Sequence, residues 1–172
     1  MNLEKELTSP RSMNQTLAVV NWIGTDPRRV EQLIKAYLGA NSRTTQNAAY
    51  FMMKIGDTYP WMIEPYIGDL IKNLRSDPPT AIRRNTVRML QNHSIPKKLH
   101  GELAEKCFQY LQDRKEAIAV KAFSMTVLSN LTDLYPDLKY ELKIVIEDLM
   151  QNGSPGIKSR GGKVLRHLES IK

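Results

Sequence analysis

Apolar side chains recur at intervals of three and four residues along most of the chain, between short segments rich in glycine, proline and polar residues. That spacing puts the apolar residues on one side of a helix, so each segment predicts an amphipathic α-helix with a single buried stripe. No segment alternates apolar and polar residues for long enough to predict a β-strand. The sequence therefore predicts an all-α fold.

Breaks in the pattern divide the chain into nine expected helices. They cover about residues 13–23, 27–38, 43–55, 60–74, 80–92, 96–111, 115–134, 136–150 and 157–171. Thr25 or Asp26 is expected to cap the second helix, since a short polar side chain can accept a hydrogen bond from a free amide at a helix start. Gly24, Gly39 and Gly56 are expected to end helices, because glycine readily adopts the backbone conformation that terminates them.

The N-terminal part fits the pattern less well. Residues 1–12 are mostly polar and are expected to be a loose lead-in, with a short turn around residues 3–7. In the first expected helix Leu17, Val20 and Ile23 are spaced to point inward. Such an atypical first unit is usual in repeat proteins, because an end must cover the stack.

A motif recurs in which an apolar and a basic residue are followed by a small residue and then by an apolar pair. Its copies are Ile82, Arg83, Thr86, Met89 and Leu90, then Val120, Lys121, Ser124, Val127 and Leu128, then Ile157, Lys158, Gly161, Val164 and Leu165. A degenerate copy consists of Thr45, Gln46, Ala49, Met52 and Met53. The four copies begin 37, 38 and 37 residues apart, and so steady a period predicts an array of helical repeats.

Each part of the motif has an expected packing role. The first apolar residue enters the core, and the apolar pair fills the space one turn later. The small residue, which is Thr86, Ser124 or Gly161, is expected where two helix backbones approach closely. Glycine at this point weakens a helix by roughly 1 kcal/mol relative to alanine.

The basic residue of the motif has two interpretations. Arg83 follows Asp77 in the preceding turn and Lys121 follows Asp113, so a structural hydrogen bond or ion pair between turn and helix is one of them. The other is a ladder of basic residues that contacts an anionic partner. We favour the structural interpretation, because the motif is explained without a ligand.

The three full copies, with Ala48-Ala49, Ile55-Gly56 and Asp77-Pro78, resemble the HEAT-like repeat family, in particular its short bacterial and armadillo-type members. The resemblance covers about residues 41–171. It implies a right-handed α-α superhelix, a solenoid of about four helix pairs plus a capping C-terminal helix, in which the second (B) helices line a concave binding surface. The 34-residue period of a tetratricopeptide array does not fit. We expect one domain over residues 1–172.

Composition narrows the function classes. Twenty-five Lys and Arg residues against 18 Asp and Glu residues give a net charge of +7, which favours acidic partners. No apolar run approaches the length of a transmembrane helix, and residues 1–11 lack the apolar segment of a secretory signal. The single cysteine, Cys107, cannot form an internal disulfide, which fits a reducing compartment. We expect a cytoplasmic protein.

The sequence offers little for catalysis. His93, His100 and His167 fall in different repeats without further ligands at metal-binding spacing, so no metal is expected. Cys107 lies in an apolar stripe and is expected to be a buried, unreactive thiol. No glycine-rich phosphate loop follows a strand, so no cofactor is expected. The chain is therefore expected to be non-enzymatic.

One enzyme hypothesis remains, because HEAT-like repeats also build alkylpurine DNA glycosylases. Trp22, Asp26 and Arg28 include the residue types of such a catalytic site. We interpret their proximity as a coincidence of spacing in the first unit. Release of a base from alkylated DNA would overturn that interpretation.

Aligning the B helices on Leu74, Leu111 and Leu149 predicts three columns of residues on the concave surface. They are Lys72, Gln109 and Glu147, then Asn73, Tyr110 and Asp148, then Asp69, Lys106 and Ile144. Their charges are mixed, so they do not predict a stripe that follows a phosphate backbone. The densest basic groups lie instead on the first (A) helices of the repeats, at Arg83, Arg84 and Arg88 and at Lys158, Arg160, Lys163 and Arg166.

The leading hypothesis is a non-enzymatic scaffold that presents a curved helical surface to a protein or peptide partner. The candidate contacts are Lys72, Lys106, Tyr110, Arg84, Arg88, Lys163 and Arg166. Nucleic-acid binding through the basic surfaces is the alternative, and glycosylase-like activity is a remote variant of it.

Overall fold

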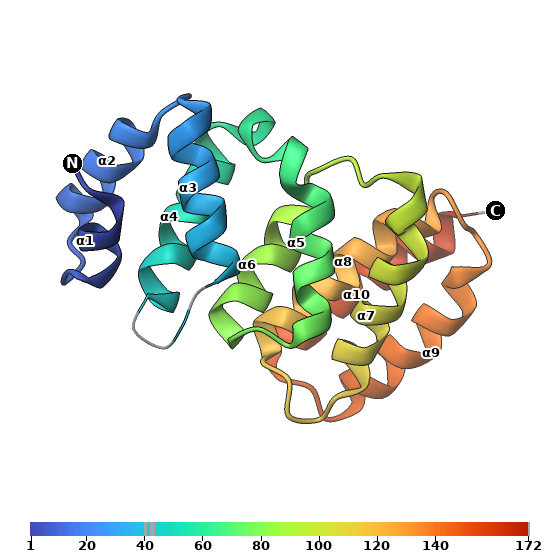
Figure 1. Cartoon of the computed structure of the whole chain (residues 1–172). Coiled ribbons are helices and arrows are strands. Elements are labelled where there is room, and N and C mark those ends of the chain that lie inside the picture. The colour runs from blue at the N-terminus through green and yellow to red at the C-terminus, as the bar shows by residue number, and fades with distance from the viewer. Residues whose placement is uncertain (40, 42–43, 172) are drawn as a thin grey trace. The chain divides into compact units, whose positions relative to one another are not determined.

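A computed structural model of the chain describes residues 1–39, 41 and 44–171 (Figure 1). The described residues are 78% helical, with 3₁₀ turns included, and form ten α-helices and no strand. The all-α prediction is therefore confirmed. Two compact units divide the chain, Met1–Met89 and Leu90–Lys172, and the expectation of one domain over residues 1–172 stays a prediction.

The first unit begins with short α1 and continues through five further helices. They are α1 (Leu3–Thr8), α2 (Met13–Ile23), α3 (Pro27–Leu38), α4 (Thr45–Thr58), α5 (Ile67–Asn73) and α6 (Thr80–Leu90). The second and third cover the predicted residues because their ends are specified locally. Ser12 and Asp26 accept hydrogen bonds from free amides at the two starts, and Gly24, with a φ of 51°, ends α2.

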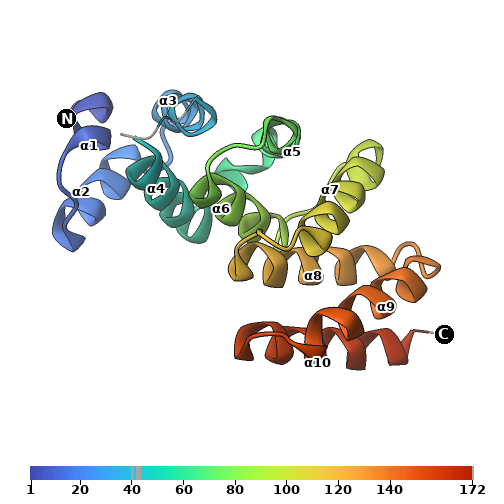
Figure 2. The same ribbon diagram turned by 90° about the horizontal axis from the view of Figure 1, so that it is seen from below.

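The second unit contains four helices, α7 (His100–Gln112), α8 (Ile118–Thr132), α9 (Leu138–Gln151) and α10 (Pro155–Ser170). Figure 2 shows α8 and α10 lying side by side, and α9 packs against both of them. The predicted ends of these helices hold to within a few residues. Ser154 caps α10 and Pro155 occupies its first turn, where the missing amide hydrogen has no cost.

Tyr37 joins α3 to α6 in the first unit. Its side chain is completely buried, and its hydroxyl donates to the backbone carbonyl of Ile82 on α6 at 2.8 Å. The Thr86 hydroxyl lies 2.8 Å from the same oxygen and supplies its second hydrogen bond. Burial raises the pKa of Tyr37 far above its ordinary value, so the phenol stays neutral and keeps its donor.

The small residues of the motif lie against side chains of neighbouring helices. Thr86 meets the Tyr37 hydroxyl, and buried Ser124 lies beside the thiol of Cys107. At Gly161 an added Cβ would lie 2.6 Å from Met150 Sδ and 3.0 Å from a side-chain methyl of Ile146. The space beside these three residues is filled by side chains of neighbouring helices, and the close approach of the helix backbones stays a prediction.

The first apolar residue of the motif behaves as predicted. Ile82, Val120 and Ile157, the first residues of the three full copies, are buried. Arg83 donates from Nη1 to the carbonyl oxygen of Pro78 at 2.7 Å, which confirms a structural hydrogen bond between turn and helix in that copy. The structural role expected for Lys121, which is itself buried, stays a prediction.

Two helix ends in the first unit differ from expectation. Gly56 does not stop α4, which continues to Thr58, and an added Cβ at Gly56 would lie 3.0 Å from Met89 Sδ on α6. A side chain at this position would therefore press on that of Met89. The helix ends before Pro60, because proline disfavours helical backbone in the residue that precedes it. The predicted start at Arg43 lies outside the described residues.

The predicted helix over residues 60–74 is broken into shorter pieces. Two 3₁₀ turns, Pro60–Met62 and Glu64–Tyr66, precede α5, and a third turn, Leu74–Ser76, follows it. Pro65 lies inside the second turn and lacks the amide hydrogen that a continuous α-helix requires. The inward stripe is nevertheless retained, with Ile63, Ile67, Leu70, Ile71 and Leu74 all buried.

The segment expected to be a loose lead-in contains the helix α1. Leu3 and Leu7 are buried, and the side-chain amide of Asn47 on α4 donates to the carbonyl oxygens of Glu6, Leu7 and Ser9 at 2.9–3.2 Å. The prediction that Leu17 points inward is also wrong, because its side chain is 49% exposed. Periodicity alone did not reveal which side of α2 its neighbours cover.

The packing at Gly161 predicts opposite effects for two adjacent substitutions. Gly161→Ala must displace Met150 or Ile146, and it is expected to lower the free energy of unfolding by about 1–2 kcal/mol. Gly162→Ala meets only Arg166 Nη1 at 3.7 Å, so the better helix former is expected to stabilise the chain by up to about 1 kcal/mol. Urea unfolding of both variants measures the difference, and equal stabilisation would contradict the proposed packing role.

Candidate functional site

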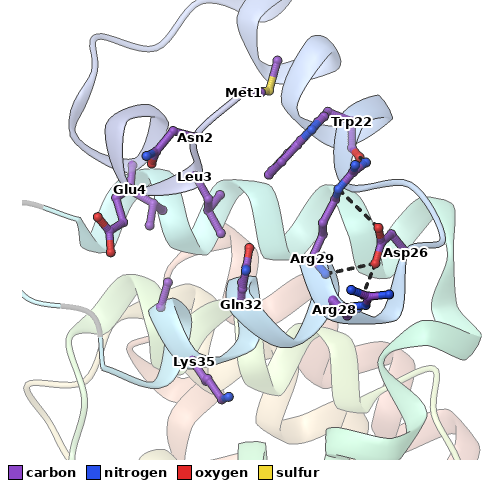
Figure 3. Close-up of a pocket in the computed structure, with 12 residues that line it drawn as sticks. Met1, Asn2, Leu3, Glu4, Trp22, Asp26, Arg28, Arg29, Gln32 and Lys35 are labelled. Carbon is purple, nitrogen blue, oxygen red and sulfur yellow. Dashed lines mark hydrogen bonds and ion pairs between the residues drawn. The ribbon is translucent and has the colours of Figure 1, made fainter.

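A cavity of about 920 Å³ lies in the first unit among α1, α2 and α3 (Figure 3). Its charged and aromatic lining comprises Glu4, Trp22, Asp26, Arg28, Arg29 and Lys35. Three of these, Trp22, Asp26 and Arg28, are the residues that raised the glycosylase hypothesis. The structure thus places in one pocket three residues whose proximity we interpreted as a coincidence.

The carboxylate of Asp26 is occupied by the first turn of α3. Its Oδ1 accepts hydrogen bonds from the backbone amides of Arg28 at 2.9 Å and Arg29 at 3.4 Å. Its Oδ2 lies 3.3 Å from Nε of Arg29. This is the geometry of a helix N-cap, in which a side-chain oxygen satisfies amides that have no partner within the helix.

Arg29 in turn covers one face of Trp22. The guanidinium carbon lies 4.6 Å from the centre of the Trp22 rings, and Nη1 donates to the Trp22 carbonyl oxygen at 2.5 Å. Figure 3 shows Arg29 between Trp22 and Asp26. A flat ligand would have to displace this guanidinium before it stacked on that face.

The remaining charged groups of the cavity do not form an acid–base pair. Nζ of Lys35 lies 2.7 Å from the Glu31 carboxylate, and this hydrogen bond raises the pKa of Lys35, which keeps it charged. Arg28 is exposed and uses its backbone amide to complete the cap. The cavity therefore has the contacts of a braced turn between α2 and α3, which explain Asp26 and Trp22 without catalysis.

The second unit carries an exposed apolar ridge on α9. Tyr140 is 64% exposed and Ile144 is 68% exposed, one helical turn apart. Leu142 and Ile146, on the opposite side of the same helix, are completely buried. Ile144 belongs to a predicted column, whereas Tyr140 was missed. Tyr140 lies four residues before Ile144 and outside the buried stripe, and this spacing predicts that the two residues share an exposed side of the helix.

The thiol and the imidazoles have structural neighbours. Burial raises the pKa of Cys107 to about 12, and the adjacent Ser124 hydroxyl offsets part of that effect. The His100 ring nitrogens lie 2.7 Å from the Ile95 carbonyl oxygen and 2.9 Å from the Tyr135 hydroxyl. Within residues 1–39, 41 and 44–171, no three His, Cys, Asp or Glu side chains are placed to share a metal ion.

Comparison with known protein families matches residues 3–168 to the HEAT repeat domain. The chain belongs to the HEAT repeat family. HEAT repeats generally serve as scaffolds for protein interactions and are typically non-enzymatic. No curated protein and no solved structure matches the chain significantly. In the described part of the chain, no helix combines the length and apolarity needed to cross a bilayer.

Four of the predicted contacts lie on the surface of the described helices. Lys72 on α5, Arg84 on α6, and Lys163 and Arg166 on α10 are exposed. Their side chains are therefore accessible to a partner. Their participation in binding stays a prediction.

The predicted exposure of Tyr110 is wrong. Its side chain is only 3% exposed, because residues 103, 107 and 110 share one face of α7 and all three are buried. Aligning the B helices on Leu111 placed Tyr110 outside the buried stripe, which is in fact wide enough to include it. Lys106 is half-buried, with Nζ 5.1 Å from the centre of the Tyr110 ring.

Several basic residues of the A helices are held by contacts within the fold. Arg88 bonds both oxygens of Asp57 at 3.0 and 3.1 Å. Arg160 donates from Nη1 to Thr126 Oγ1 at 2.5 Å and to Gln91 Oε1 at 3.2 Å. With Arg83 bonded to Pro78, the basic groups that are densest in the sequence include arginines with structural roles.

The capping geometry predicts how Asp26 responds to substitution. Asp26→Ala is expected to lower the free energy of unfolding by about 1 kcal/mol, whereas Asp26→Asn is expected to keep most of it because asparagine also caps helices. Urea unfolding measures both effects. Neither the unmodified chain nor the variants should release a base from alkylated DNA. Release by the unmodified chain that Asp26→Asn abolishes would overturn this assignment.

Burial of Cys107 predicts a thiol that reacts only when the second unit opens. With a pKa of about 12, the thiol stays protonated around pH 8, and no reagent reaches it in the folded chain. Ellman's reagent should therefore react slowly in buffer and rapidly in urea. Complete reaction of the folded chain within minutes would show that Cys107 is accessible.

Proposed function

We propose that this HEAT repeat chain is a non-enzymatic binding module that presents the exposed sides of its B helices to a protein or peptide partner. The family assignment supports the scaffold class, since HEAT repeats generally mediate protein interactions. In this chain, the principal surface that contacts the partner is the solvent side of α9.

The observation that carries the proposal is the apolar ridge of Tyr140 and Ile144. Exposed apolar residues scattered singly are ordinary, but a β-branched and an aromatic residue stacked one turn apart form a contiguous patch. Tyrosine is also enriched at the centres of protein interfaces, where its ring is buried and its hydroxyl finds a polar partner. The ridge lies on a B helix, the kind of helix that the resemblance to HEAT-like arrays assigns to the binding surface.

Nucleic-acid binding has weaker support. Tight binding of a phosphate backbone requires several free cations that lie along one surface. Arg83, Arg88 and Arg160 make hydrogen bonds or ion pairs within the fold. The solvent side of α9 itself carries more carboxylates than lysines, which would repel phosphate.

Affinity capture tests the proposal directly. The immobilised full chain is expected to recover a protein partner from a nuclease-treated lysate of cells that express it, and Ile144→Asp is expected to abolish the recovery. Leu17→Asp on α2 is the matched control, because Leu17 is also an exposed apolar residue on a helix and its substitution should leave recovery unchanged. Mass spectrometry identifies the recovered proteins.

Two results would contradict the proposal. If the Ile144→Asp and Leu17→Asp variants capture the same proteins in equal amounts, α9 is not the contact. Steep, salt-sensitive binding of DNA or RNA in a polarisation assay, with no captured protein, would favour the nucleic-acid alternative.

A further inference from the structure

The exposed side of α9 combines its apolar ridge with a line of carboxylates. Asp137, Glu141 and Asp148 are separated by four and seven residues, and Ile144 falls between the last two. Spacings of four, three and four keep these residues on one side of a helix. All four are exposed, so carboxylates and ridge form one continuous surface.

Both lysines of α9 contact groups other than the carboxylates of this line. Lys143 lies on the other flank, where its Nζ is 3.8 Å from Glu147. Lys139 donates from Nζ to the carbonyl oxygen of Ile171 at 2.9 Å, and the same Nζ lies 5.3 Å from the centre of the Tyr140 ring. Among the described residues, no ion pair or hydrogen bond of the side chains of Asp137, Glu141 or Asp148 is found.

Asp148 is, in addition, unfavourable for the helix that carries it. It lies in the last turn of α9, where the exposed carbonyl groups give the helix end a partial negative charge. A negative side chain there destabilises a helix, and this last turn contains no basic residue to offset it. The placement of Asp148 is therefore not explained by the stability of α9.

We propose that this surface binds a basic amphipathic segment of a partner protein. An aliphatic or aromatic side chain of that segment packs against Tyr140 and Ile144, while its lysine or arginine residues face Asp137, Glu141 and Asp148. Apolar contact supplies affinity at the centre of such an interface, and complementary charge at its edge selects the partner and its orientation. This inference rests on the proposed function and names the chemistry of the partner.

Two synthetic peptides of about 14 residues, roughly four helical turns, provide the probe. Both carry the same leucine face, and their polar face is entirely lysine in one and entirely glutamate in the other. Fluorescence anisotropy with the full chain is expected to show binding of the lysine peptide at least about tenfold tighter than that of the glutamate peptide. Equal affinities would overturn the proposal.

A charge-reversal variant separates recognition by charge from non-specific binding of the peptides. The triple variant Asp137→Lys, Glu141→Lys, Asp148→Lys is expected to reverse the preference, so that the glutamate peptide binds more tightly. The control variant Glu4→Lys, Glu31→Lys, Glu64→Lys makes the same change in net charge on exposed residues of the first unit outside α5 and should keep the original preference. Reversal in both variants would show that net charge, and not this surface, selects the peptide.

The apolar ridge has its own control. Tyr140→Ser with Ile144→Ser is expected to weaken the lysine peptide by at least about tenfold, whereas Met13→Ser with Leu17→Ser on α2 should not, although those side chains are 61% and 49% exposed. An equal loss of affinity for the lysine peptide in the two double variants would overturn the role of the ridge. Thermal unfolding followed by circular dichroism confirms that all variants fold.

The outcomes distinguish this inference from the function on which it rests. If capture recovers a partner that depends on Ile144 but the peptides show no charge preference, the inference fails and the proposed function stands. If the chain instead forms a concentration-dependent dimer that the Tyr140→Ser, Ile144→Ser variant abolishes, the occupant is a second copy and the inference fails. If no partner is captured and neither peptide binds, both proposals are wrong.

Discussion

A small residue in each motif helix leaves space for side chains from neighbouring helices, and the packing of both units depends on it. Thr86 receives the hydroxyl of Tyr37, and Gly161 receives the side chains of Ile146 and Met150. A short amphipathic helix cannot bury its apolar stripe alone, so these contacts are where the stripes of successive helices meet. The polar examples carry a further constraint, since a buried hydroxyl such as that of Tyr37 must keep its hydrogen bonds.

The same structure accounts for most of the polar side chains that suggested chemistry. Asp26 caps α3, Arg29 covers Trp22, and Arg88 is bonded to Asp57. Each of these residues satisfies a helix end or joins two helices, and this use leaves it poorly suited to bind a ligand. A pocket with the right residue types is thus explained by the needs of a turn between two helices, because capping and catalysis draw on the same short list of side chains.

Against this background the solvent side of α9 is unusual. Asp137 occupies the N-cap position of α9 but its side chain accepts no hydrogen bond from the first amides, and two large apolar residues of the helix face water. Membership of the HEAT repeat family assigns the chain to a class of scaffolds, but it says nothing about the partner. The chemistry of one exposed helix face is what narrows the choice, because contact area and charge select a partner in ways that the repeat architecture does not.

The amino-acid sequence by itself determined where most of the helices lie, that Thr25 or Asp26 caps α3, and that the motif repeats, because these depend on spacing and on the local chemistry of turns. Only the tertiary structure decided which directions around each helix are covered. It exposed Leu17, buried Tyr110 and placed Gly56 inside a helix against Met89. It also revealed that Asp26 and Trp22 share a pocket and that Tyr140 extends the ridge of Ile144. The physical reason is that periodicity gives the angle of a side chain about its own helix axis, whereas burial depends on what a neighbouring helix places at that angle.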